Sequence, residues 1–450
     1  MGHISMKRSH ERLQQRLDAH PVGAPAHPAL FDILKILFSE QEAELAARMP
    51  YGFSSTRKLS RILKRPEAEL EPILNSMADR GLLFDLIRKD RNYWYLNPLV
   101  IGFFEFTMMR VRTDVNQKEI AHKMYEYMFE DPAMAFMREV GYGGETQLFR
   151  PLVHEENLPE DYVEVLDYER ATHLVENAGA WTVGLCHCRH VAEHRGVPCA
   201  KSVPGRKDPL EVCLSFGEPA QFFARRGLGK AIEKPEALDI LAGAKANGLV
   251  QLGDNVQRRP TFICNCCDCC CELLEGYNRL KETPFLKTSS YEPEIAHDKC
   301  IRCGICVKAC PVDALVMPEK SDALPVEQRQ GPGWRSRVYD LELVEKFCLG
   351  CGVCATKCPR DCITMQPRSV RVHTPESTIE KVMLMALERG KLQNLLFDNP
   401  NAAGHGVMRT FFKVLLTLPP GKQLLASQQL KSRFVRFLVN KASSRPGADT

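Results

Sequence analysis

Apolar positions in the N-terminal part of the chain recur every three or four residues, which is the spacing of one face of a helix. Four helices are predicted there, one of them over 41–48. The apolar faces of the other three consist of Leu30, Ile33, Leu34 and Leu37, then Leu59, Ile62 and Leu63, then Leu70, Ile73, Leu74 and Met77. Pro66 occupies a favoured first-turn position of the last helix, and Gly81 ends that helix.

Two short β-like segments follow these helices, over 82–88 and 93–96, and the polar residues 89–92 form the turn between them. This order of helices and hairpin is similar to that of winged helix-turn-helix domains, and it places such a domain at 28–98. Residues 1–27 are expected to be a flexible lead-in.

The resemblance to winged helices raises the question of DNA binding. In helix-turn-helix proteins the second helix of the motif enters the major groove, and here that helix is Pro66–Arg80. Its charged residues are Glu67, Glu69, Glu71 and Asp79, with Arg80 as the single cation. Because phosphates attract Lys and Arg, this acidic helix disfavours DNA as a partner. DNA binding remains an alternative to an interaction module that reuses the fold.

Two further helical regions are expected. The first is a connector over 99–145, where Met and Phe side chains form an apolar stripe that is typical of a packing face. The second is a basic C-terminal region over 371–450. Its amphipathic segment 405–441 is expected first to pack on the protein itself, second to dock on a redox partner, and third to associate with an anionic membrane surface.

Two cysteine runs with identical spacing carry the clearest chemistry. The first comprises Cys300, Cys303, Cys306 and Cys310 before Pro311, and the second comprises Cys348, Cys351, Cys354 and Cys358 before Pro359. Both fit C-x2-C-x2-C-x3-C-P, a spacing that ligates [4Fe–4S] clusters. Over about 291–370 the chain therefore resembles the bacterial-type dicluster ferredoxins.

This resemblance implies two halves related by a pseudo-twofold axis, two [4Fe–4S] clusters and one-electron transfer at low potential. Each run contributes three ligands to one cluster and its fourth cysteine to the other. The first cluster is then held by Cys300, Cys303, Cys306 and Cys358, and the second by Cys348, Cys351, Cys354 and Cys310. Residues 318–337 are expected to be an inserted loop, and Cys362 a packed thiol rather than a ligand.

A second group of cysteines occupies the predicted middle domain, 146–290. The candidate ligands there are Cys186, Cys188, Cys199, Cys213, Cys264, Cys266, Cys267, Cys269 and Cys270. Such a dense set favours metal binding, either an additional iron–sulfur cluster or tetrahedral zinc with thiolates alone or with His187, His190 or His194. The pattern C-H-C-R followed by N-C-C-x-C-C resembles a family of multidomain ferredoxin-like proteins from anaerobic microbes, over about 146–370.

The predicted elements together indicate an α+β multidomain protein, and length and composition agree with several globular domains. The 450 residues suggest about three domains, and 44% hydrophobic and 26% charged residues are ordinary values for a globular protein. The 19 cysteines have metal-ligand spacings, which require reduced thiols and indicate the cytoplasm. No signal peptide is evident, and no apolar run reaches the roughly 20 residues of a spanning helix.

These patterns favour an iron–sulfur electron-transfer protein that works with a redox partner protein. No P-loop or dinucleotide fingerprint is present, so an electron carrier or oxidoreductase subunit is a better interpretation than a stand-alone enzyme. One alternative is an iron–sulfur redox-sensing transcription regulator that uses the winged helix. The other is an oxidoreductase whose middle cluster binds substrate.

Overall fold

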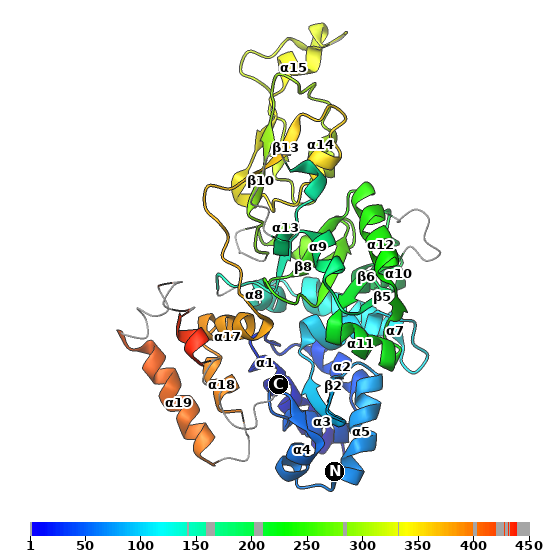
Figure 1. The fold of residues 1–450 in the computed structure, drawn as a ribbon, viewed down its shortest axis with the longest axis vertical. Coiled ribbons are helices and arrows are strands. Elements are labelled where there is room, and N and C mark those ends of the chain that lie inside the picture. Colours follow the sequence, from blue (N-terminus) through cyan, green and yellow to red (C-terminus); the bar gives the residue numbers. More distant parts are fainter. Residues whose placement is uncertain are drawn as a thin grey trace.

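The computed structural model describes residues 2–141, 144–158, 167–201, 210–281, 286–331, 333–398, 403–419, 427, 431 and 433–438. Helices and strands are mixed, as expected for an α+β chain, and four small sheets are present in these residues. Figure 1 shows the N-terminal region at one end of the long axis, the ferredoxin-like region at the other, and the six-stranded sheet between them.

The N-terminal region contains the predicted helices and hairpin. Its elements are α2 (Pro28–Leu37), α3 (Glu40–Ala47), β1 (Ser54–Ser55), α4 (Thr56–Leu63), α5 (Glu67–Asp79), β2 (Leu83–Arg88) and β3 (Arg91–Leu96). The three strands form a sheet in the order β1-β3-β2. Ser39 and Glu42 form a capping box at the start of α3, and Ser55 caps α4. The polar residues at these positions therefore set where the helices begin.

The flexible lead-in expected for residues 1–27 is wrong for most of its length. Helix α1 spans Gly2–Asp18 and packs against α3. Leu13 and Leu17, one turn apart, are buried in the main core, and the Gln14 amide donates to the Ala24 carbonyl at 2.7 Å. The tertiary contact stabilises a helix whose own apolar pattern is short.

The connector and the N-terminal region share one hydrophobic core. The connector consists of the π-helical turn Leu99–Phe103, α6 (Phe104–Met108), α7 (Gln117–Tyr125), the π-helical turn Glu126–Glu130 and α8 (Ala135–Gly141). Phe103, Phe104 and Phe136 are almost fully buried in this core. The Met- and Phe-rich stripe is therefore a packing face.

The middle region is built on an antiparallel six-stranded sheet with the order β4-β8-β9-β6-β5-β7. Its strands are β4 (Phe149–Pro151), β5 (Trp181–Leu185), β6 (Glu211–Phe216), β7 (Lys230–Ile232), β8 (Val250–Asp254) and β9 (Phe262–Cys266). Its helices are α9 (Ala171–Glu176), α10 (His187–His194), α11 (Gly217–Arg226), α12 (Lys234–Ala246) and α13 (Glu272–Arg279).

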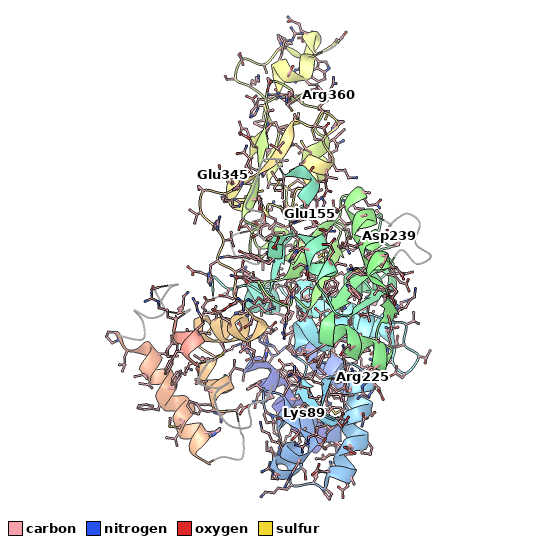
Figure 2. The ribbon with its side chains drawn as sticks, viewed as in Figure 1. Lys89, Glu155, Arg225, Asp239, Glu345 and Arg360 are labelled. Atoms are coloured by element: carbon pink, nitrogen blue, oxygen red, sulfur yellow. The ribbon has the colours of Figure 1, made fainter. Side chains whose placement is uncertain are left out.

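Helix α11 joins the middle region to the N-terminal sheet. Asp85 of β2 is buried and is paired with Arg225 and Arg226 at 3.2 and 3.1 Å. Figure 1 shows α11 beside the N-terminal region, and Figure 2 labels Arg225 of this helix. Phe84 and Phe222 pack with ring centroids 4.4 Å apart, so charge pairing and apolar contact hold the same junction.

The ferredoxin-like region has two matching halves. In one half, β10 (Tyr291–Ile295) is followed by α14 (Ile305–Ala309) and β11 (Leu315–Val316); in the other, β12 (Glu342–Leu343) is followed by α16 (Val353–Thr356) and β13 (Ile363–Pro367). Strand β10 pairs with β13, and β11 with β12, both antiparallel. The expected insertion carries the short helix α15 (Trp334–Val338).

The helices that follow the ferredoxin-like region in the described part of the chain include α17 (Thr378–Glu388), α18 (Leu392–Leu396) and α19 (Ala403–Thr417). Leu384, Leu387 and Leu416 contribute to a separate small core. Of the segment 405–441, residues 420–426, 428–430, 432 and 439–441 lie outside the described residues. None of the described helices has the length and apolar character needed to span a bilayer.

Candidate metal and cluster sites

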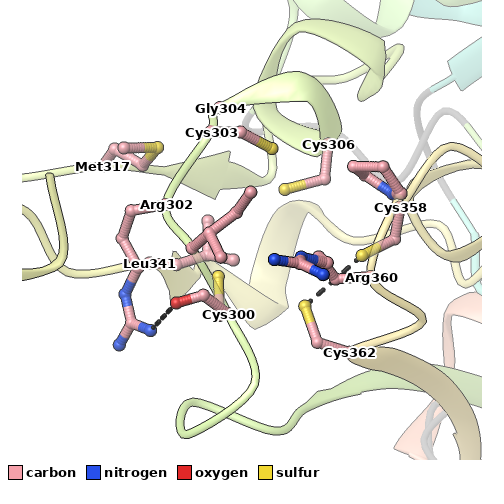
Figure 3. A pocket seen from close by; sticks show the side chains of 12 residues that line it. Cys300, Arg302, Cys303, Gly304, Cys306, Met317, Leu341, Cys358, Arg360 and Cys362 are labelled. Carbon is pink, nitrogen blue, oxygen red and sulfur yellow. Dashed lines mark hydrogen bonds between the residues drawn. The ribbon is translucent and has the colours of Figure 1, made fainter. Parts of the chain in front are cut away.

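The first cysteine pocket combines the two runs. Cys300, Cys303 and Cys306 line it together with Cys358 of the second run, and their side chains face the same space (Figure 3). Gly304 has φ +79° and allows the chain to turn from the ligand loop into α14. Because α14 and α16 pack together, the fourth cysteine of the second run reaches the first run.

Cys362 is a fifth thiol in this pocket. Its Sγ lies 3.3 Å from that of Cys358 (Figure 3), and the side chain is buried. The sequence analysis expects a packed thiol here, and Cys362 is indeed buried, but it lines the same cavity as the four candidate ligands.

The second pocket has the reciprocal composition. Cys348, Cys351 and Cys354 line it together with Cys310 of the first run. The backbone N–H of Ala314 donates to the Cys310 sulfur at 3.2 Å, and Arg368 donates to the Cys348 carbonyl at 3.0 Å. Donors of this kind stabilise a negatively charged thiolate and the loop that carries it.

Thiols in both pockets are shielded from water. Burial raises the pKa of Cys306 to about 11 and that of Cys351 to about 12. Such thiols bind a metal by exchanging their protons for metal charge. Two quartets of buried or half-buried cysteines, each drawn from both runs, therefore fit [4Fe–4S] ligation.

Four cysteines of the middle region form a compact outer group: Cys199, Cys267, Cys269 and Cys270. Their sulfurs all lie within 4.8 Å of one another. Cys199 lies 3.6 Å from both Cys267 and Cys269, and Cys270 lies 3.7 Å from Cys269. Among the residues that the structure describes, no other three or more Cys, His, Asp or Glu side chains come together so closely.

Six cysteines outside this group line an inner cavity of about 80 Å³: Cys186, Cys188, Cys213, Cys264, Cys266 and Cys271. Cys267 of the outer group lines the same cavity, so the two groups adjoin. The remaining walls are largely apolar and include Met109, Met128, Phe136 and Met137 from the connector. Cys186 and Cys271 are the N-cap residues of α10 and α13, while Cys213 and Cys264 belong to the adjacent strands β6 and β9.

A charged pair lies at the edge of the inner cavity. His187 and Glu272 are both buried, and their Nε2 and Oε2 atoms are 3.0 Å apart. Burial alone would lower the pKa of His187, but the charge of Glu272 and the hydrogen bond between them raise it to about 9. Burial also raises the pKa of the Glu105 carboxyl, which lines the same cavity, to about 7.

The nine middle cysteines expected as one site thus lie at two adjoining places, and Cys267 is common to both. Sequence reasoning missed Cys271, although it continues the dense run directly after Cys270. His190 and His194 are engaged elsewhere: His190 Nδ1 lies 2.7 Å from the Met108 carbonyl, and its Nε2 lies 3.1 Å from His194. Zinc ligation by these two histidines does not fit this arrangement.

Comparison with protein families finds that residues 299–362 match the family described as 4Fe-4S dicluster domain. Neither the curated proteins nor the solved structures include a match to the chain. The family match supports the ferredoxin-like domain expected at 291–370 and at least one [4Fe–4S] cluster. Together with the compact cysteine group, it supports assignment of the chain as an iron–sulfur protein.

Proposed function

We propose that this protein transfers single electrons between a redox partner protein and a metal centre in its own middle region. Two [4Fe–4S] clusters are held in the ferredoxin-like domain, the first by Cys300, Cys303, Cys306 and Cys358 and the second by Cys348, Cys351, Cys354 and Cys310. When bound, clusters of this type accept and release one electron at a time. The chain's own residues hold, shield and connect these sites.

The observation that carries this proposal is the position of helix α13. The helix begins directly after Cys271 at the inner cavity. At its other end, Tyr277 donates to the Phe347 carbonyl at 3.0 Å, and Asn278 donates to the Pro311 carbonyl at 2.9 Å. Phe347 and Pro311 adjoin Cys348 and Cys310 of the second pocket. A helix of eight residues is about 12 Å long, so it keeps the two cysteine sites close.

Hydrogen bonds of His154 also connect the middle region to the second pocket. The backbone N–H of His154 donates to the Cys351 carbonyl at 3.1 Å. Its imidazole lies 2.9 Å from the Thr356 hydroxyl and 3.1 Å from the Leu249 carbonyl. Burial lowers the pKa of His154 to about 4, so its imidazole is neutral near pH 7. His154 therefore connects Leu249, the residue before β8, to the loop that carries Cys351, and it adds no charge between the middle region and the second pocket.

The first pocket suits contact with an external partner, because two of its four candidate ligands, Cys303 and Cys358, are half-buried, whereas in the second pocket only Cys310 is. Ile301 and Ile305 beside it are exposed by 45% and 43%, and Cys303 is half-buried. Apolar side chains at the rim of a redox site allow a partner to exclude water as it docks. The proposed order is therefore partner, first cluster, second cluster and middle region.

Iron and sulfide analysis of the full chain purified without oxygen, with EPR after dithionite reduction, tests this proposal. We expect at least about eight iron atoms per chain. Cys303→Ala and Cys351→Ala should each remove or convert one ferredoxin cluster, with loss of iron and a changed EPR spectrum. Unchanged iron in either variant would contradict the ligand assignment. Clusters that dithionite fails to reduce would contradict the electron-transfer role.

A further inference from the structure

We propose that the middle region holds two metal sites of different size. A single tetrahedral ion, zinc, is bound by Cys199, Cys267, Cys269 and Cys270. A polynuclear metal–sulfide cluster is bound in the inner cavity by Cys186, Cys188, Cys213, Cys264, Cys266 and Cys271. This assignment goes beyond the proposed electron transfer and holds whether or not the ferredoxin clusters deliver electrons.

The separation of the outer sulfurs fits one ion. Zinc lies about 2.3 Å from each thiolate in a tetrahedral site, which places the sulfurs about 3.8 Å apart. The measured separations from Cys199 to Cys267 and to Cys269 are 3.6 Å, and that from Cys269 to Cys270 is 3.7 Å. In a [4Fe–4S] cluster each thiolate binds a different iron, so its four sulfurs are spread more widely than this.

The local backbone supports the outer site. The backbone N–H of Lys201 donates to the Cys199 sulfur at 3.4 Å, and the Lys201 ammonium pairs with Asp268 at 2.8 Å. This ion pair joins the segment that carries Cys199 to the turn that carries the other three cysteines. Four thiolates complete a tetrahedral zinc shell and leave no open position, as in structural zinc sites.

Strand β9 and the turn after it supply cysteines to both sets, and Cys267 lies where the two sets adjoin. Cys264 and Cys266 are two residues apart on this strand, so they share one face, and both line the inner cavity. The strand ends at Cys266, and the following turn carries the outer cysteines. Cys271 then begins α13 and lies again at the inner cavity. The dense run thus contributes first to the inner cavity, then through its turn to the outer group, and then through Cys271 to the inner cavity again.

The inner set is too large for one ion. Six thiols exceed the four positions of a tetrahedral centre, and the cavity of about 80 Å³ is larger than the cavities of about 10 and 20 Å³ in the first and second ferredoxin pockets. Soft thiolate donors select iron–sulfur clusters or other thiophilic metals. A cluster of several metal ions with sulfide therefore fits both the number of donors and the space.

Arg189 provides the countercharge. Its side chain is buried, with 1% exposed; it hydrogen-bonds the Cys267 sulfur and interacts electrostatically with Cys186 of the inner set and Cys199 of the outer group. A zinc ion with four thiolates carries two net negative charges, and a buried charge needs a partner. A guanidinium placed between the two cysteine sets stabilises both.

Metal analysis of the full chain with matched cysteine variants tests this inference. For the wild type we expect about one zinc, with four sulfur neighbours at about 2.3 Å by X-ray absorption, and iron in excess of the eight atoms of the ferredoxin domain. Cys269→Ser should lose zinc and keep its iron. Cys264→Ser with Cys266→Ser should lose the excess iron and keep zinc. The ferredoxin EPR signals should persist in both variants and report folding.

Several results would overturn the inference. Loss of the same metal from both variants would mean one shared site, and a mononuclear iron at the outer group would exclude zinc. Eight iron atoms and one zinc in the wild type would exclude an inner iron–sulfide cluster. If the inner variant fails to fold, the zinc absorption spectrum and the iron count of the wild type still decide the matter, because each site is measured by its own metal.

Discussion

The phenol of Tyr277 donates a hydrogen bond of 3.0 Å to the carbonyl oxygen of Phe347, the residue before Cys348. Asn278 makes the equivalent bond to Pro311, the residue after Cys310. One helix therefore holds the two loops that bring both runs to the second pocket. Tyr277 is also buried. Removal of its hydroxyl would therefore leave the Phe347 carbonyl without a donor where water has little access.

Tyr277→Phe combined with Asn278→Ala should loosen this junction without removing a cluster. Each net hydrogen bond contributes about 1 kcal/mol, so the pair should cost about 2 kcal/mol and raise hydrogen exchange in the segment 345–352. Iron content should stay at the wild-type value. Tyr51→Phe is a matched control, because Tyr51 donates a similar bond to the Arg16 carbonyl far from the clusters. Equal exchange in the double variant and the control would contradict the bridging role.

The ferredoxin-like region could be predicted from the sequence because its information is local. Each run places three sulfurs within a few residues, so spacing alone indicates a cluster ligand loop. The middle region is different, since β6 and β9 pair across about fifty residues and bring Cys213 beside Cys264. Sheet order, which the sequence does not display, decides which cysteines meet, and the division into two sites could not be foreseen.

The N-terminal region could be predicted only in part. The element order was predictable from helical spacing and turn residues, but the packing of α1 was not, because it depends on how α1 meets α3 in the folded chain rather than on its own short apolar pattern. The acidic character of α5 was also predictable from the sequence. In the structure Glu67, Glu69 and Glu71 are exposed, and Asp79 pairs with Arg226 of the middle region at 2.8 Å. That DNA is a disfavoured partner of this acidic helix stays a prediction.

The proximity of Cys358 and Cys362 predicts partial exchange of ligands in the first pocket. Cys362→Ser should keep both ferredoxin clusters. Cys358→Ser should retain part of the first cluster, because the Cys362 sulfur, 3.3 Å away, can take the vacant position. The double variant should lose that cluster and about four iron atoms. Iron analysis with EPR checks all three variants, and full loss in Cys358→Ser alone would exclude exchange.

We expect a side chain at position 350 to disturb the second pocket. It lies between Cys348 and Cys351 with φ +71°, and a Cβ there would lie 2.1 Å from the Tyr291 carbonyl oxygen. Gly350→Ala should therefore displace the ligand loop and lower the iron content by about four atoms. Gly331→Ala is the matched control, because Gly331 has φ +74° but open space around its Cβ position. Equal iron contents in the two variants would contradict the steric argument.

Helix α19 presents an apolar stripe that we expect to bind an anionic membrane surface. Val407, Phe411 and Val414 are exposed by 71, 61 and 53%, whereas Leu416 is buried against the small core. Arg409 and Lys413 lie on the same helix, which contains no acidic residue, so its charge complements anionic headgroups. The arrangement favours a lipid surface over an acidic protein because the apolar side chains form a continuous row.

Co-sedimentation with vesicles of phosphatidylglycerol and of phosphatidylcholine checks this prediction. The wild type should bind the anionic vesicles, and Phe411→Glu with Val414→Glu should weaken binding by about tenfold or more, because two apolar side chains are lost. Val326→Glu with Val370→Glu adds the same charge at exposed positions elsewhere and should bind like the wild type. A wild type that stays in the supernatant would exclude the membrane as the occupant of this face.

Because His20 is buried, we expect the stability of the N-terminal region to fall in acid. Its ring accepts from the Val22 N–H at 3.2 Å and lies 3.2 Å from the Tyr95 hydroxyl. Burial lowers its pKa to about 3, and the nearby charges of Lys391, Arg16 and Arg389 act in the same direction. Below about pH 6.5 the unfolded chain binds a proton that the folded chain excludes, so the free energy of unfolding falls by about 1.4 kcal/mol per pH unit until about pH 3.

Urea unfolding between pH 5.0 and 7.5 measures this dependence, followed by tryptophan fluorescence, to which buried Trp94 of the N-terminal region contributes. The wild type should lose about 2 kcal/mol from pH 6.5 to 5 through His20 alone. His20→Gln should be less stable at pH 7.5, because it loses the fitted ring, but its stability should fall less steeply with acid. His122→Gln is the control, since His122 is exposed and should leave the slope unchanged. Parallel pH profiles for the wild type and His20→Gln would show that another group carries the acid sensitivity.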